Sequence, residues 1–160
     1  MRVQKGFSLI ELLIVVAIIL TIAAMSIPNL IRSKMSANEA SAVSSLRTIN
    51  TAQTTYAISY PEVGYADALT KLAAASGGGP ATSANAGLLD WVLGCATQPC
   101  AKSGYRFSII NATGTPVSAY QVTAVPQTPG QTGRRGFCSD QVPKMQYDPN
   151  GGTACTLPLQ

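Results

Sequence analysis

Three residues near the N-terminus could take part in chemistry together: Gly6, Phe7 and Glu11. A cut after Gly6 would give Phe7 a free amine, one helical turn away from the Glu11 carboxylate. Glu11 stands in an otherwise apolar run, where an acidic side chain costs about 2.5 to 3.5 kcal/mol at mid-membrane and less near the interface. We therefore expect Glu11 to pair with the new amine, either of its own chain or of a neighbour.

The apolar run covers residues 7–31 and predicts a membrane-spanning helix. A helix of this length spans roughly 37 Å, which is enough to cross a bilayer. It is longer than the apolar core of an ordinary signal peptide, and no small-x-small cleavage site ends it. Arg2 and Lys5 precede it, so the positive-inside rule places the N-terminus in the cytoplasm. Pro28 lacks an amide hydrogen and is expected to kink the helix or open it locally.

The stretch KGFSLIELLIVVAIILTIAAMSIPNL resembles the N-terminus of a type IV pilin or a related pseudopilin. It combines a short basic leader, Gly6 before a cut, Phe7 after it, Glu11, a long apolar helix and Pro28. The resemblance implies cleavage between Gly6 and Phe7 by a membrane prepilin peptidase, followed by N-methylation of Phe7. It also implies that Glu11 neutralises the amine of a neighbour during filament assembly.

Residues 32–60 are expected to continue the same helix, because they contain neither glycine nor proline and Pro61 follows them. Small and apolar side chains recur there every three to four residues, which gives one stripe that another element must cover. The stripe comprises Ala37, Ala40, Val43, Leu46, Ile49, Tyr56 and Tyr60, with Gln53 in the gap. Tyrosines at this spacing are expected to pack in a core.

The C-terminal part changes to a period of two, which predicts strands. The expected strands are 105–110, 119–125, 136–140 and 143–148. An antiparallel sheet of three or four strands across the helix stripe gives an α+β fold, the type IV pilin fold. A short helix is expected at about 66–75, and the segment 88–94, with the sole tryptophan, is expected to anchor on the core.

This reading divides the chain into four parts. They are a leader at 1–6, a transmembrane and assembly helix at 7–31, the amphipathic half of the same helix at 32–60, and a globular head at 61–160.

The four cysteines all lie in the C-terminal half, which favours disulfides in an oxidising compartment. The pairing Cys95–Cys100 with Cys138–Cys155 is preferred because it closes local loops, and the other two pairings stay open. A four-cysteine zinc site is the alternative, which the absence of paired C-x2-C knuckles disfavours.

Residues suited to catalysis are scarce. The chain has no histidine, the commonest general base and metal ligand, and we expect no catalytic residue, metal site or cofactor. Asp140 and Asp148 could contribute to a calcium site in a C-terminal loop, as in related pseudopilins, but the stretch offers few of the six to eight oxygens that calcium needs. Asn111 begins a glycosylation pattern, for which turn chemistry is the favoured interpretation.

The net charge of +4 is too small and too dispersed to predict nucleic-acid binding. Arg134 and Arg135 are interpreted as a solvated turn. They and Lys102 would be the first candidates if the chain belonged to a DNA-uptake pilus.

The sequence thus predicts a non-enzymatic subunit of a type IV pilus, which serves adhesion or twitching motility. Its expected partners are copies of itself in a helical filament, a prepilin peptidase and the inner-membrane pilus assembly machinery. The precursor would lie in the inner membrane and the product outside the cell. The alternatives are a type II secretion pseudopilin in a periplasmic pseudopilus and a membrane-anchored periplasmic domain that stays monomeric.

Overall fold

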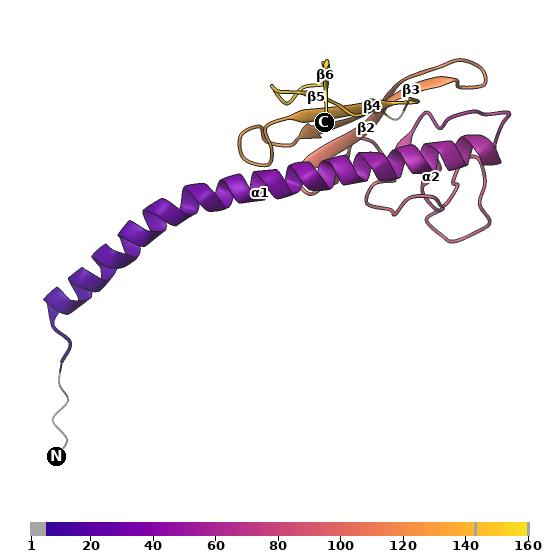
Figure 1. Cartoon of the computed structure of the whole chain (residues 1–160). Helices are drawn as coiled ribbons and strands as arrows, with labels where there is room; N and C mark the ends of the chain where they lie inside the picture. Colours follow the sequence, from indigo (N-terminus) through magenta and orange to yellow (C-terminus); the bar gives the residue numbers. More distant parts are fainter. Residues whose placement is uncertain (1–5, 143, 160) are drawn as a thin grey trace. The chain divides into compact units, whose positions relative to one another are not determined.

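The computed structural model describes residues 6–142 and 144–159, drawn in colour in Figure 1. It divides into two compact units, Met1–Lys34 and Met35–Gln160, and each is described by itself. The leader expected at 1–6 lies outside the described residues except for Gly6.

One helix, α1 (Leu9–Ser59), crosses the division between the units and ends before Pro61, as expected. Helical structure is continuous through Pro28. In the first unit the large apolar side chains of α1 are exposed, so this part of the helix has its apolar surface available all round. A helix that is apolar all round needs a lipid or protein environment to cover it.

The second unit contains the remaining elements (Figure 1). They are α2 (Leu69–Leu72), β1 (Cys100–Lys102), β2 (Tyr105–Thr113), β3 (Ala119–Pro126), β4 (Gly136–Asp140), β5 (Gln146–Asp148) and β6 (Leu157–Pro158). The strands form one antiparallel sheet in the order β1-β2-β3-β4-β5-β6, so each strand pairs with its neighbours in the sequence.

The fold is α+β, a long helix packed against a C-terminal antiparallel sheet, which confirms the predicted class. The predicted number of three or four strands was wrong, because the sheet has six strands within the described residues. Its two edge strands, β1 and β6, have three and two residues, too few to show an alternating pattern in the sequence. The expected helix at 66–75 is reduced to the four residues of α2.

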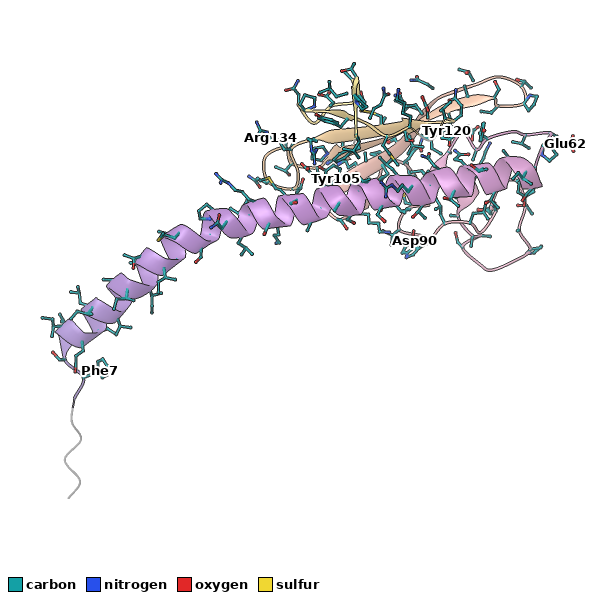
Figure 2. The ribbon with its side chains drawn as sticks, in the orientation of Figure 1. Phe7, Glu62, Asp90, Tyr105, Tyr120 and Arg134 are labelled. Carbon is teal, nitrogen blue, oxygen red and sulfur yellow. A yellow bond between two sulfur atoms is a disulfide. The ribbon has the colours of Figure 1, made fainter. Side chains whose placement is uncertain are left out.

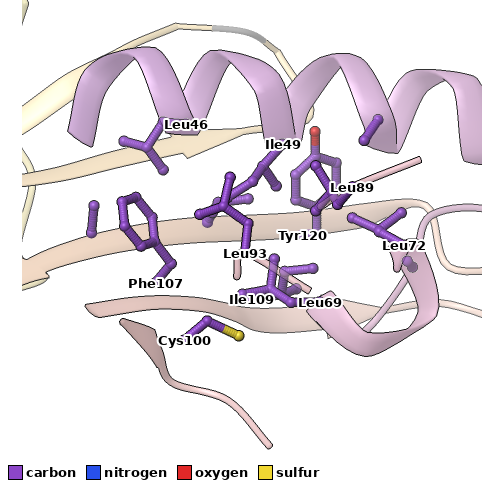
Figure 3. Packing of buried hydrophobic residues seen from close by; sticks show 14 of the residues in the cluster. Leu46, Ile49, Leu69, Leu72, Leu89, Leu93, Cys100, Phe107, Ile109 and Tyr120 are labelled. Carbon is purple, nitrogen blue, oxygen red and sulfur yellow. The ribbon is translucent and has the colours of Figure 1, made fainter. Parts of the chain in front are cut away.

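Figure 3 shows the core between α1 and the sheet, with Leu46 and Ile49 of the helix above Phe107 and Ile109 of β2. These side chains are at most 3% exposed. The alternation in β2 therefore places its apolar residues against the helix stripe, as a half-buried strand requires.

The buried part of the stripe is shorter than the predicted one. Burial on α1 begins at Ala42 and extends to Tyr56, whereas Ala37 and Ala40 are exposed. Tyr56 and Tyr60 pack with ring centroids 5.0 Å apart, in agreement with a packing role for the tyrosines.

The segment 88–94 differs from its prediction in one important residue. Leu89 and Leu93 are buried and anchor the segment, but Trp91 is 81% exposed. A single turn accounts for this arrangement, because the Gly94 amide donates to the Asp90 carbonyl oxygen at 2.9 Å. Within a helical turn, positions four apart share one face and the residue between them points away from it.

Two disulfides close local loops of the head. They join Cys95 to Cys100 and Cys138 to Cys155, the pairing preferred from the sequence. The second holds the C-terminal tail to β4 across 17 residues, for which chain-entropy arguments give a stabilisation of about 3 kcal/mol.

One buried polar side chain fixes the chain after α1. Gln53 is fully buried, and its amide forms two hydrogen bonds with the backbone of Ala66. The Nε2 group donates to the Ala66 carbonyl oxygen and Oε1 accepts from the Ala66 amide, each at 2.8 Å. Gln53 thus satisfies both backbone groups of a residue that water does not reach.

Replacement of Gln53 by Leu should lower the free energy of unfolding by roughly 2 to 4 kcal/mol, because both polar groups of Ala66 would be left buried without a partner. Chemical denaturation of the detergent-solubilised chain measures this change. Thr55→Ala is the matched control, since it removes an exposed hydroxyl that bonds only within α1. An equal effect of the two substitutions would contradict the role given to Gln53.

Candidate processing and assembly site

Gly6, Phe7 and Glu11 lie around the first turn of α1. Gly6 and Phe7 precede the helix and are exposed, Phe7 by 77%. The backbone amide of Ser8 donates to Glu11 Oε2 at 2.9 Å. The Glu11 carboxylate is therefore held at the amide of Ser8. Ser8 directly follows Phe7, the residue that would carry the new amine after a cut behind Gly6.

The contact between Ser8 and Glu11 is a feature that the sequence reasoning missed. Ser8-x-x-Glu11 has the spacing of a capping box, in which the third helical residue accepts a hydrogen bond from the residue that caps the helix. The carboxylate is also favourably placed near the positive end of the helix dipole. This spacing could have been recognised in the sequence as a signal for where the helix begins.

The stem that follows this site is α1 up to residue 34. The helix contains a window with a mean hydropathy of 2.7 and no buried residue, so it is long and apolar enough to cross a membrane. Thr21, a polar side chain within the apolar run, donates to the carbonyl oxygen of Ile18 at 2.8 Å. Its hydroxyl is thus satisfied inside the helix.

Residues 1–27 match the family model described as the prokaryotic N-terminal methylation motif. The N-terminal segment therefore carries this motif. It is also similar to the type IV wide pilus major component PilA4 of Thermus thermophilus, with 59% identity over 39 residues. That match covers 24% of this chain and 30% of the relative.

No solved structure matches the chain. The likeness to known pilins therefore concerns the stem, and the head must be described from its own residues.

Two of the three cations named for a DNA-uptake pilus form ion pairs within the head. The ammonium group of Lys102, in β1, lies 3.6 Å from the Asp90 carboxylate. The Arg135 guanidinium lies 2.7 Å from the Glu39 carboxylate. Two of the three candidates thus have an acidic partner within the head, which leaves little free positive charge for phosphates.

The structure also separates Asp140 from Asp148. Asp148 pairs with Gly136 at the start of β4, whereas Asp140 ends that strand. Four residues of strand correspond to about 13 Å, so the two carboxylates cannot share one calcium ion. Among the described residues no group of three potential metal-ligating side chains occurs.

Asn111, the first residue of the glycosylation pattern, lies in β2 with a φ of 54°. The pairing of β2 with β3 shifts register between Ile110 and Thr113. Asparagine tolerates this left-handed conformation better than most residues, so its local backbone role is the simpler interpretation.

A groove of about 630 Å³ in the head lies between α1 and the last residues of the sheet. We call it the α1–β6 groove. It is lined by Arg47, Asn50, Thr51, Thr54, Lys144, Met145, Pro158 and Leu159. These described residues include two cations and three apolar side chains but no acid, so the groove suits a partner that is apolar and negatively charged.

Next to this groove, Glu39 connects α1 to the segment before β4. Its carboxylate accepts from the backbone amides of Arg134 and Arg135 at 2.9 and 3.2 Å and from Arg135 Nε at 2.9 Å. Burial acts to raise the pKa of Glu39, but these hydrogen bonds and the Arg135 charge outweigh it, and the pKa is lowered from its ordinary value of 4.5.

A carboxyl whose pKa is depressed in the folded state contributes stability above its unfolded pKa and loses it as the pH falls through the folded pKa. Glu39→Gln should therefore destabilise the head by roughly 1 kcal/mol near neutral pH, because a charged acceptor of three hydrogen bonds is lost. The difference from the unmodified protein should shrink as the pH falls below 4.5. Thermal unfolding across this pH range measures it.

Glu62→Gln is the control for this prediction, because Glu62 is an exposed carboxylate just beyond the end of α1 (Figure 2). A Glu39→Gln difference that stayed constant at low pH would show that the charge of Glu39 does not contribute to the stability of the head.

Proposed function

We propose that this protein is a structural subunit of a type IV pilus filament. The observation that carries the proposal is the arrangement at the start of α1, where Glu11 lies one residue from the amine that a cut after Gly6 would release. The methylation motif over residues 1–27 supports the same processing.

In this proposal the chain enters the inner membrane as a single-pass precursor with a cytoplasmic N-terminus. A prepilin peptidase cuts between Gly6 and Phe7, and the new amine of Phe7 is methylated. Gly6 suits this step because a residue without a side chain lets the backbone enter a protease cleft in an extended form. The exposure of Gly6 and Phe7 ahead of α1 supports their access to such an enzyme.

Glu11 has different partners before and after assembly. In a single chain its carboxylate accepts from the Ser8 amide, which lowers the cost of holding a charge in the apolar run. In a filament the Phe7 amine of a neighbouring copy is a stronger partner, because both groups are charged. This ion pair then favours the axial position of each incoming α1 at which its Glu11 carboxylate contacts the Phe7 amine of the neighbouring copy.

The exposed stem supplies most of the apolar contact. Its side chains leave lipid when the subunit is extracted, and only the stems of other copies can then keep them from water. Pro28 leaves one backbone carbonyl of the preceding turn without its helical partner, which allows the stems to bend or extend in a filament. Adhesion or twitching motility would follow from the assembled pilus.

The alternative function is that of a type II secretion pseudopilin. The likeness to the pilus component PilA4 favours the pilus. Mass spectrometry of the N-terminus separates the two when applied to material sheared from cells and to washed envelopes. We expect a chain that begins at methylated Phe7 in the sheared fraction. The same terminus found only in envelopes would indicate a pseudopilin, and an uncut chain would contradict both.

Glu11→Gln tests the charge of Glu11 apart from its capping role. Glutamine can still accept the Ser8 hydrogen bond but cannot neutralise an amine. Because a charged group that loses its buried partner costs about 3 kcal/mol or more, we expect sheared filaments to fall by roughly 100-fold. Immunoblots of sheared and membrane fractions measure this, and the subunit should still accumulate in the membrane.

Thr21→Val is the matched control. It removes a hydroxyl group from the same apolar run, and this hydroxyl donates only to a carbonyl oxygen of its own helix. It should leave filaments unchanged. Normal filament assembly of Glu11→Gln would exclude the amine pairing. A chain that reaches the membrane but forms no filaments, with or without Glu11→Ala, would fit a membrane-anchored domain that stays monomeric.

A further inference from the structure

The sole tryptophan of the chain is exposed on a rigid part of the head. Trp91 is 81% exposed and the adjacent Val92 is 41% exposed. Leu89 and Leu93 fasten the turn to the core on either side, and the disulfide from Cys95 begins directly after it. A large aromatic side chain held in place at the surface loses little entropy on binding, and such residues often dominate interfaces.

Asp90 adds a negative charge beside the indole. Its side chain is 51% exposed, and its carboxylate lies 3.6 Å from the Lys102 ammonium group. Its Oδ1 also accepts from the Leu93 amide at 3.3 Å, which holds the carboxylate at the start of the turn. Asp90 and Trp91 thus form a projection that combines an exposed indole with a half-exposed carboxylate.

The α1–β6 groove is complementary to this projection. Arg47 and Lys144 supply positive charge, and Met145, Pro158 and Leu159 supply apolar surface. A guanidinium or ammonium group attracts both a carboxylate and the face of an indole ring. At about 630 Å³ the groove lies within the roughly 300–1,000 Å³ range of sites that hold whole small ligands, so a side chain of this size can enter it.

The projection and the groove lie at opposite edges of the sheet. Asp90 is next to Lys102 of β1, the first strand, whereas Pro158 belongs to β6, the last. Asp90 in Figure 2 and β6 in Figure 1, drawn in the same orientation, lie on opposite sides of α1. One head therefore cannot fill its own groove, but a second copy can.

We propose that Asp90 and Trp91 of one copy dock into the α1–β6 groove of the next copy. This contact rests on the proposed filament function and gives the heads a specific role in it. Because the two surfaces differ, the contact is heterologous and repeats without closing on itself unless the rotation completes a ring. The stems would hold the subunits together, and the head contact would fix the rotation from one subunit to the next.

Trp91 is its own reporter, since the chain contains one tryptophan. Intrinsic fluorescence and acrylamide quenching are measured on the full chain dispersed in detergent and in sheared filaments. In filaments we expect emission at shorter wavelength and quenching that falls several-fold. Filaments in which Trp91 is quenched as readily as in dispersed subunits would overturn the head contact while leaving the filament function intact. Failure of the unmodified chain to assemble at all would overturn both.

Charge reversal identifies the receiving surface. Lys144→Glu should leave Trp91 open to acrylamide in filaments, whereas Arg106→Glu, the same change on the exposed side of β2, should leave it protected. If Trp91 is protected equally in both variants, it docks elsewhere and the proposal is wrong.

A crosslink decides the matter even if Lys144→Glu prevents assembly. Filaments of Val92→Cys/Thr51→Cys, which keep Trp91, should give a ladder of disulfide-linked copies on a non-reducing gel, because Val92 is exposed beside Trp91 and Thr51 lines the groove. Val92→Cys/Ile58→Cys is the control, since Ile58 is also exposed on α1 but does not line the groove. No ladder with the first pair, or equal ladders with both, would overturn the proposal.

Discussion

The face of α1 between Ala42 and Tyr56 is the surface against which the rest of the head is arranged. The apolar side chains of β2 and β3 cover it, and Asn50 donates to Ser139 of β4 at 2.6 Å and accepts from Tyr120 of β3. The sheet can lie in one register only, because a shift by one residue would turn Phe107 and Ile109 away from the helix. In the described part of the first unit, the large apolar side chains of the same helix are exposed.

Two polar side chains of α1 hydrogen-bond to backbone segments of the head and hold them against the helix. Gln53 holds the chain just after α1 and Glu39 holds the segment before β4, so the helix is tied to both the beginning and the later part of the head. Each uses several hydrogen bonds to backbone groups, which are costly to leave unpaired when buried. The disulfide between Cys138 and Cys155 attaches the C-terminal tail to β4 of the head.

The sequence was informative where a pattern was long or chemically unusual. The apolar run, the helix stripe and Pro61 predicted α1 and its end, and the alternating residues predicted β2 to β4. It was uninformative for β1 and β6, whose pairing is determined by neighbouring strands and not by their own few residues. Trp91 was misplaced because hydrophobicity alone does not tell which side of a short turn faces the core, and the α1–β6 groove depends on tertiary structure that no local pattern encodes.

The order of the sheet has a consequence for how the head forms. Each strand pairs with the one before it, so the contacts between strands are local along the chain and the sheet can grow one hairpin at a time. Because synthesis proceeds from the N-terminus, α1 is complete before any strand appears, and it can serve as the template on which successive hairpins settle. Local connectivity of this kind favours rapid folding of the head once α1 has formed.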